Sequence, residues 1–288
     1  MSARSWLFAP GDSERKMDKA TAGAADIVIL DLEDAVAEGE KPKARSMVRS
    51  FLTAHADDRA RLWVRINPIQ GPHALADLAA VMPAAPSGIM LPKPRGRADA
   101  ELLDHYLTAF EASSGIEVGV TQVIPLVTEM PESMLAIGSY AGVPRVAAMS
   151  WGGEDLATAL GASENRGSYG GYDFTYELAR SLCLVAAAAA GVPAIETIHG
   201  DFKDDAGLRR RAADMRRAGY RGMLAIHPAQ VEVINEAFSP SAAEVAAAEE
   251  IVALFAANPG KGTIGHNGAM LDRPHLARAQ AVLALARS

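Results

Sequence analysis

Eight short apolar runs recur along this chain of 288 residues, and segments with helical spacing lie between them. The runs are rich in β-branched and aliphatic residues, as buried parallel strands are. Strand followed by helix, repeated eight times, predicts a TIM-type (β/α)8 barrel of the α/β class, with a doubly wound open sheet as the alternative. The runs read SWLFAP, DIVILDLE, RLWVRIN, GIMLPK, TQVIPLVTE, RVAAMSW, PAIETIH and GMLAIHP.

The pattern changes after residue 235. The segment SPSAAEVAAAEEIVALFAANPGKG predicts a capped amphipathic helix, PGKGTIGHNGAMLD a glycine-rich loop, and RPHLARAQAVLALARS a last helix. None of these adds a strand-and-helix unit to the barrel. We therefore expect a catalytic barrel domain over residues 1–235 and a C-terminal helical extension over residues 236–288.

Composition narrows the partners and the compartment. A formal net charge of −7 leaves no broad basic surface, which argues against nucleic acid or an anionic membrane as the main partner. No apolar run approaches the ~20 residues that span a bilayer, and the N-terminus has no secretory pattern. The single cysteine, Cys183, falls in an alanine-rich helical stretch typical of a reduced, packed thiol. These features predict a cytoplasmic protein.

Polar residues follow the apolar part of every predicted strand. In a barrel these carboxyl ends converge on one mouth, where catalytic groups of such enzymes lie. Helix N-capping accounts for Asp34 and for Asp12, but it does not explain the other residues together. The endings are Pro10-Gly11-Asp12, Asp31/Glu33/Asp34, Arg65/Asn67, Lys93, Glu129, Glu154/Asp155, Glu196 and His227.

Two of these carboxylates suit a hard divalent cation. Glu129 and Asp155 end neighbouring strands, and carboxylate oxygens with open positions for water and substrate favour Mg²⁺. An acid/base dyad or simple pairing with arginine remains the alternative. Asp31, Glu33 and Asp34 are then placed to orient the waters on the metal.

An arginine and a helix start complete the predicted mouth. Arg65, at the end of VRIN, is placed to clamp an anionic substrate through its guanidinium, or else to bridge strand-end carboxylates. The turn at Gly152 and Gly153 leads into a helix, so the amides of Glu154 and Asp155 are expected to face a ligand carboxylate. No strand-glycine-helix dinucleotide fingerprint occurs, which argues against NAD.

These motifs, in this order, resemble the citrate lyase beta subunit-like CoA ester lyases of the HpcH/HpaI aldolase/citrate lyase superfamily. The resemblance covers nearly the whole chain. The motifs that carry it are RSWLFAPGD, ADIVILDLEDAV, KPKAR, VRIN, LPK, PLVTE, WGGEDLATALG, LARSLCLVAAAAAGV, IHPAQVEVINEAFSPSAAEV and GAMLDRPHLARA.

The resemblance implies an Mg²⁺-dependent carbon–carbon lyase. Such enzymes cleave or form a C–C bond of a β-hydroxyacyl-CoA, such as malyl-CoA or citramalyl-CoA, giving acetyl-CoA or a related acyl-CoA plus a 2-keto acid. Glu129 and Asp155 match the family's metal ligands. Arg65 matches the residue that contacts the keto acid or the thioester oxygen.

The resemblance also implies a CoA pocket and a shared site. Phe8, Lys19, Ile226 and His227 match positions that hold the CoA part. Asp272 of GAMLD matches an aspartate that relatives deliver into a neighbouring subunit's site, where it acts as acid/base on the acetyl group. A homotrimer or a dimer of trimers is therefore expected.

Other reactions remain open at this stage. The same site suits an acyl-CoA thioesterase, a CoA-free hydroxy-keto-acid aldolase, or a citrate lyase beta subunit acting on an acyl-carrier-protein thioester. The keto acid itself depends on a methyl-sized difference in pocket volume, which strand-end motifs do not report.

Overall fold

A computed structural model describes residues 3–168 and 170–286 of the chain. Eight parallel strands lie in one sheet in the order β5-β4-β3-β2-β1-β8-β7-β6. The two ends of this order meet, because Leu126 after β5 forms a parallel bridge with Ser150 of β6. The predicted barrel is confirmed as a nearly closed one, and the open sheet is wrong. The strands are β1 (Ser5–Pro10), β2 (Ile27–Asp31), β3 (Leu62–Arg65), β4 (Gly88–Leu91), β5 (Gln122–Pro125), β6 (Met149–Ser150), β7 (Ala194–Glu196) and β8 (Gly222–Ala225).

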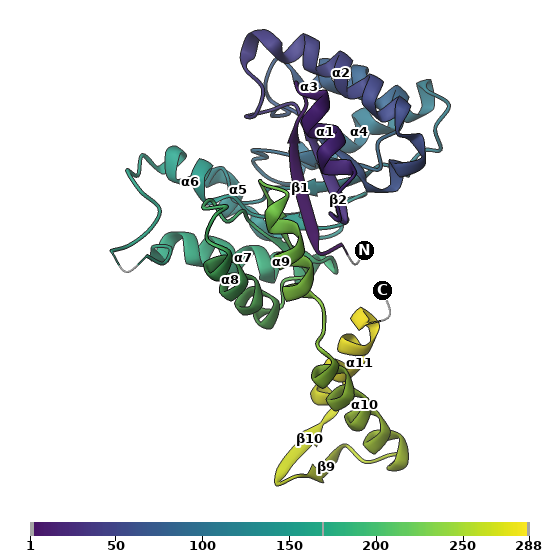
Figure 1. Cartoon of the computed structure of the whole chain (residues 1–288), viewed down its shortest axis with the longest axis vertical. Coiled ribbons are helices and arrows are strands. Elements are labelled where there is room, and N and C mark those ends of the chain that lie inside the picture. The colour runs from purple at the N-terminus through teal and green to yellow at the C-terminus, as the bar shows by residue number, and fades with distance from the viewer. Residues whose placement is uncertain (1–2, 169, 287–288) are drawn as a thin grey trace.

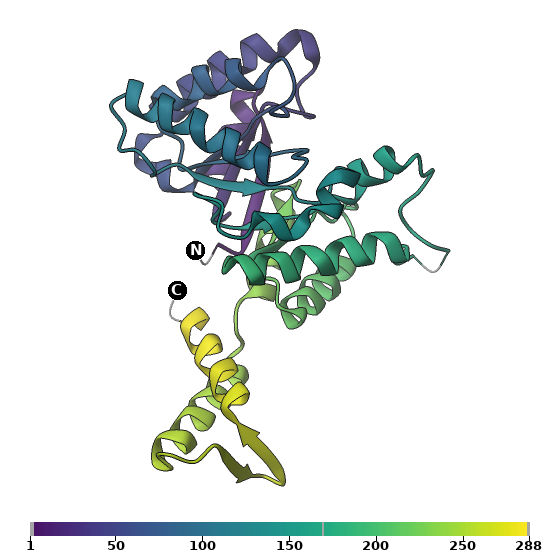
Figure 2. The ribbon, with the colours of Figure 1, turned by 180° about the vertical axis from the view of Figure 1, so that it is seen from behind.

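Helices surround the strands on the outside of the barrel, as Figures 1 and 2 show from opposite sides. Cys183 is buried in α7, as the alanine-rich pattern predicts. No helix in the described part of the chain has both the length and the apolar character to cross a membrane. The helices of the barrel are α1 (Glu14–Thr21), α2 (Lys41–Ala54), α3 (Ala74–Val81), α4 (Arg97–Ser113), α5 (Pro131–Leu135), α6 (Gly153–Leu160), α7 (Phe174–Ala190), α8 (Asp205–Ala218) and α9 (Ala229–Phe238).

Apolar side chains fill the barrel interior. Trp6 and Trp63 lie edge to face with ring centroids 5.1 Å apart, within a buried cluster that includes Ile29 and Ile124. A Cβ atom at Gly88 would collide with the Trp63 ring, so glycine is needed there for the strands to pack. A solid interior leaves the carboxyl-end mouth as the place for a ligand.

The C-terminal extension is a separate lobe that projects from the barrel in Figure 1. It consists of α10 (Ala242–Ala257), β9 (Thr263–His266), β10 (Ala269–Asp272) and α11 (Arg273–Ala286). Ser241 and Glu244 form the expected capping box at the start of α10. An ion pair of 3.0 Å between Arg216 of α8 and Glu244 joins the lobe to the barrel.

Two details of the extension differ from the sequence prediction. The division at residues 235 and 236 falls inside α9, which packs on the barrel through the buried Phe238 and ends there. The predicted glycine-rich loop contains a β-hairpin, with β9 and β10 antiparallel. Asn267 and Gly268 make its turn with φ of 48° and 76°, which suits a two-residue turn with both central residues left-handed.

Candidate active site

A cavity of about 390 Å³ opens at the carboxyl ends of the strands. Side chains from most of the strand-end loops line it, so the predicted convergence on one mouth is found. Trp151 and Thr197 also line the cavity and had no predicted role. The predicted site residues in its lining are Phe8, Asp31, Arg65, Glu129, Gly153, Glu154, Asp155 and Ile226.

Arg65 lies in a fixed position on one wall of this cavity. Residue 65 pairs with Asp31 in the register of β3 on β2. Its Nε and Nη2 donate to the two carboxylate oxygens of Asp31 at 2.7 and 2.6 Å, and Nη1 lies 3.1 Å from Glu33 Oε2. The guanidinium carbon lies 4.7 Å from the centroid of the Phe8 ring. Burial lowers the pKa of Arg65, but Asp31 and Glu33 raise it overall, so the side chain stays cationic.

Asp31 also shapes the loop that follows β2. Its oxygens accept hydrogen bonds from the backbone N–H groups of Glu33 and Ala35, at 2.9 and 3.1 Å. The same carboxylate therefore orders the loop and orients Arg65. This double contact explains why an apolar strand ends in a cluster of acidic residues.

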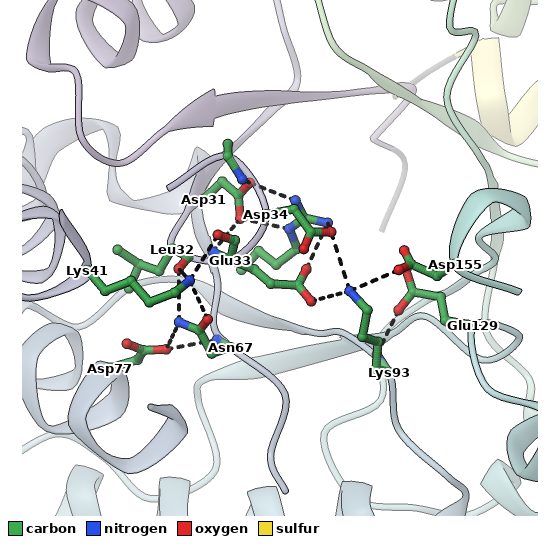
Figure 3. A network of polar contacts seen from close by, with 12 residues as sticks. Asp31, Leu32, Glu33, Asp34, Lys41, Asn67, Asp77, Lys93, Glu129 and Asp155 are labelled. Carbon is green, nitrogen blue, oxygen red and sulfur yellow. Dashed lines mark hydrogen bonds and ion pairs between the residues drawn. The ribbon is translucent and has the colours of Figure 1, made fainter. Parts of the chain in front are cut away.

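Lys93 joins the acidic loop to the opposite wall, and the sequence indicated it only as a strand-end residue. Its ammonium lies 2.5 Å from Glu33 Oε1, 3.3 Å from Asp34 and 3.1 Å from Asp155, as Figure 3 shows. Burial lowers the pKa of Lys93, but Glu33 and Glu129 raise it overall. Its backbone has a φ of 49°, a conformation that is uncommon outside glycine and is enriched at functional sites.

Glu129 is a buried carboxylate of the site, only 3% exposed. Its Oε2 accepts a hydrogen bond of 2.7 Å from the Lys93 backbone N–H. A Cβ atom at Gly152 would lie 2.9 Å from its Oε1, so glycine there permits the close approach. Burial, followed by the charges of Asp155 and Glu33, raises the pKa of Glu129 well above its ordinary value. Burial similarly raises the pKa of Glu33 to about 7.

This donor set fits a divalent cation. Among the described residues, the carboxyl groups of Asp31, Glu33, Asp34, Glu129 and Asp155 lie around the cationic side chains of Arg65 and Lys93, so a bound cation would offset the excess of negative charge that these groups carry when deprotonated. Within residues 3–168 and 170–286 no three His, Cys, Asp or Glu side chains form a complete metal cage. A cation held by Glu129 and Asp155 would thus leave positions for water and substrate.

Several predicted residues lie outside this cavity's lining, and Glu33, which contacts Arg65 and Lys93, is one of them. Lys19 is exposed in the last turn of α1. His227 stacks on Phe202 with ring centroids 4.8 Å apart. Glu196 is fully buried and pairs with Arg211 at 2.5 Å, so this strand end serves the packing beneath the mouth.

Asp272 also lies outside the lining, because it ends β10 in the projecting lobe. Its carboxylate lies 2.5 Å from His275 Nδ1, and the side chain is 36% exposed. Figure 1 shows β10 at the end of the lobe farthest from the barrel. The cavity of one chain therefore does not include Asp272 of the same chain.

The geometry defines a class: a (β/α)8 enzyme whose mouth combines two carboxylates, the buried Glu129 and the partly exposed Asp155, with a clamped arginine. The profile described as HpcH/HpaI aldolase/citrate lyase matches residues 4–228. The chain belongs to this family, and the predicted membership, which makes it a lyase-type enzyme, is confirmed.

Several relatives match over nearly the whole chain. A citrate lyase subunit beta-like protein of Mycobacterium tuberculosis is 36% identical over 96% of this chain and 93% of its own. A (3S)-malyl-CoA thioesterase of Cereibacter sphaeroides is 34% identical, over 99% of this chain and 95% of the thioesterase. The mitochondrial citramalyl-CoA lyase of Rattus norvegicus is 32% identical, over 99% of this chain and 86% of the lyase.

Solved structures agree with the fold, and some of them contain magnesium. The crystal structure of CitE from M. tuberculosis in complex with magnesium, acetoacetate and coenzyme A superposes with a TM-score of 0.83 at 33% identity, covering 100% of this chain and 99% of that one. A further structure of the M. tuberculosis citrate lyase beta subunit contains oxaloacetate and magnesium, with a TM-score of 0.72.

Proposed function

We propose that this chain is an Mg²⁺-dependent CoA ester lyase. Its substrate is a β-hydroxyacyl-CoA such as malyl-CoA or citramalyl-CoA, and its products are acetyl-CoA or a related acyl-CoA and a 2-keto acid. The observation that carries the proposal is that the buried Glu129 and the partly exposed Asp155 line one cavity together with Arg65. The relatives named citramalyl-CoA lyase and the CitE complex with magnesium, acetoacetate and coenzyme A support it.

The chain's own groups stabilise charge during cleavage. In cleavage, a carboxylate of the cavity accepts the proton of the 3-hydroxyl, and the electron pair of the broken C–C bond moves onto the thioester as an enolate oxygen charge. Arg65, held cationic by Asp31 and Glu33, stabilises the negative oxygens. Glu129 and Asp155 would hold Mg²⁺, which would supply Lewis acidity toward the keto-acid oxygens. Trp151 and Phe8 give the cavity apolar walls that limit water.

Asp272 is proposed to act in a neighbouring subunit of a homotrimer or a dimer of trimers. Its position on a projecting lobe, outside the cavity of its own chain, supports this arrangement. Its carboxyl group would donate a proton to the acetyl carbon during cleavage, and its carboxylate would remove that proton during condensation. The pKa of Asp272 is lowered, chiefly by the hydrogen bond to His275, so a carboxylate is available as the base in the condensation direction.

Hybrid oligomers test the shared site. Asp272→Ala and Glu129→Gln should each be inactive alone. After the two variants are dissociated together and reassociated, activity should return to about one quarter of the wild-type rate, because each site then draws its two groups independently from two subunits. Activity that stays at zero in a mixture shown to exchange subunits would rule out the arrangement, and so would a monomeric protein.

An assay with separate product readouts tests the reaction itself. Purified protein is given Mg²⁺ with malyl-CoA or citramalyl-CoA, and keto acid and free thiol are followed in parallel. Keto acid without free thiol is expected. Free thiol without keto acid would instead establish a thioesterase, the second candidate, which the malyl-CoA thioesterase relative favours. If neither keto acid nor free thiol is formed, the result would favour an acyl-carrier-protein substrate or a CoA-free aldolase.

A further inference from the structure

We infer that Lys41 is a positioning residue for the active site, a role that rests on the proposed lyase function. Lys41 is the first residue of α2 and is only 7% exposed. Its side chain reaches back to the loop that follows β2 and carries Glu33 and Asp34. Figure 3 shows Lys41 and Lys93 on opposite sides of this loop.

All three protons of the Lys41 ammonium are used. The Nζ atom donates to the backbone carbonyls of Leu32 and Glu33, each at 3.1 Å, and to Asn67 Oδ1 at 2.7 Å. These three acceptors are uncharged oxygens. Burying an ammonium on uncharged acceptors costs free energy relative to water, so the arrangement is a poor choice for stability alone. Its effect is to fix two consecutive carbonyl groups of the loop.

A second layer holds the third acceptor in place. The Asn67 amide donates to the Leu32 carbonyl at 2.9 Å and to Asp77 Oδ2 at 2.7 Å. Asp77 is fully buried and is paired with Arg45 of α2 at 2.7 Å. The loop is thus tied from behind to α2, to the end of β3 and to α3.

This rear attachment determines where Glu33 points. Asp31 holds the backbone N–H of Glu33 on the side of the cavity, while Lys41 holds its carbonyl on the opposite side. With the backbone fixed at both ends, the Glu33 carboxylate meets Arg65 and Lys93 at 3.1 and 2.5 Å. Loosening the loop would displace a carboxylate that both cationic side chains of the site depend on.

The test replaces Lys41 by methionine, which has a similar length and no donors. Lys43→Met on the same helix is the matched control, since that lysine is 67% exposed and its ion pair is with the exposed Glu40. For Lys41→Met we expect kcat to fall about 10- to 100-fold and the affinity for Mn²⁺, measured by electron paramagnetic resonance without substrate, to fall by a similar factor. KM for the thioester should change less than about 3-fold, because the CoA contacts lie elsewhere.

A merely structural lysine would give a different result. Wild-type kcat and Mn²⁺ affinity in a Lys41→Met protein with a lowered Tm would overturn the inference. If Lys41→Met does not fold, Asn67→Ala carries the test with the same expectations, and failure of both to fold would assign the cluster to stability alone. If the wild-type protein is inert on both thioesters, the proposed reaction fails, yet weakened Mn²⁺ binding in Lys41→Met still supports the positioning role.

Discussion

Glu129→Gln should make the protein more stable and nearly inactive at the same time. In Mg²⁺ we expect kcat to fall by at least about 10³-fold, because the substitution removes the charge of a proposed ligand of the metal on which charge stabilisation would depend. In EDTA we expect Tm to rise by about 3 °C, the shift that ~1 kcal/mol gives a chain of this size. A loss of function with a gain in stability is typical of a site whose charges are assembled for chemistry.

The gain in stability follows from burial and like charge. The pKa of Glu129 is raised well above its ordinary value by burial and then by Asp155 and Glu33. A carboxyl with a raised folded pKa stabilises the fold below its unfolded pKa and loses that contribution as pH rises through the folded value. Glu33, with a pKa of about 7, behaves in the same way. In EDTA the wild-type Tm should therefore fall between about pH 5 and pH 8, and less so in Glu129→Gln.

The measurements are kcat in Mg²⁺ and thermal unfolding in EDTA over this pH range. Glu132→Gln is the control, since Glu132 is exposed in the first turn of α5 and should leave both quantities unchanged. The Lys93 backbone N–H that donates to Glu129 can donate equally to a glutamine oxygen, so the variant keeps its local geometry. A lowered Tm in EDTA would contradict the view that the carboxylate is electrostatically strained.

The alternation of strand and helix was sufficient to predict the barrel. All eight apolar runs are strands of the sheet, because a strand buried on both faces needs a nearly continuous apolar run. The hairpin of the extension was harder to predict, since β9 and β10 have mostly exposed side chains and lack a marked apolar alternation. The Asn267-Gly268 pair was the one local signal for it.

The sequence was sufficient to predict the charged residues that line the cavity, but not the contacts that hold the neighbouring loops in position. Glu129, Asp155 and Arg65 follow apolar runs directly, so the geometry of a barrel brings them together. The contacts of Lys93 and Lys41 depend on loop conformations and on partners 60 and 26 positions away in the sequence, which periodicity does not report. The LPK ending of the fourth run, a lysine opposite the acidic loop of the second, was the available signal for Lys93.

Arg65→Lys should preserve the fold and lose most of the activity. Lysine keeps the positive charge between Asp31 and Glu33, so Tm should change little. The arginine guanidinium donates to both oxygens of Asp31, at 2.7 and 2.6 Å, and places its third nitrogen near Glu33. The single ammonium of lysine cannot make all of these contacts. We expect kcat/KM for the thioester to fall about 10²- to 10³-fold, the range found when one preorganised donor is removed.

Arg65→Met separates the structural role of the charge from its catalytic role. Methionine leaves the buried carboxylates of Asp31 and Glu33 without their main cation, which should destabilise the protein by about 3–5 kcal/mol in urea unfolding. Arg209→Lys, an exposed arginine of α8 paired with Glu236, is the control and should change neither quantity. If Arg65→Lys retained wild-type kcat/KM, the guanidinium would serve only to neutralise the two carboxylates, and substrate charge would have to be stabilised by Lys93 and the metal.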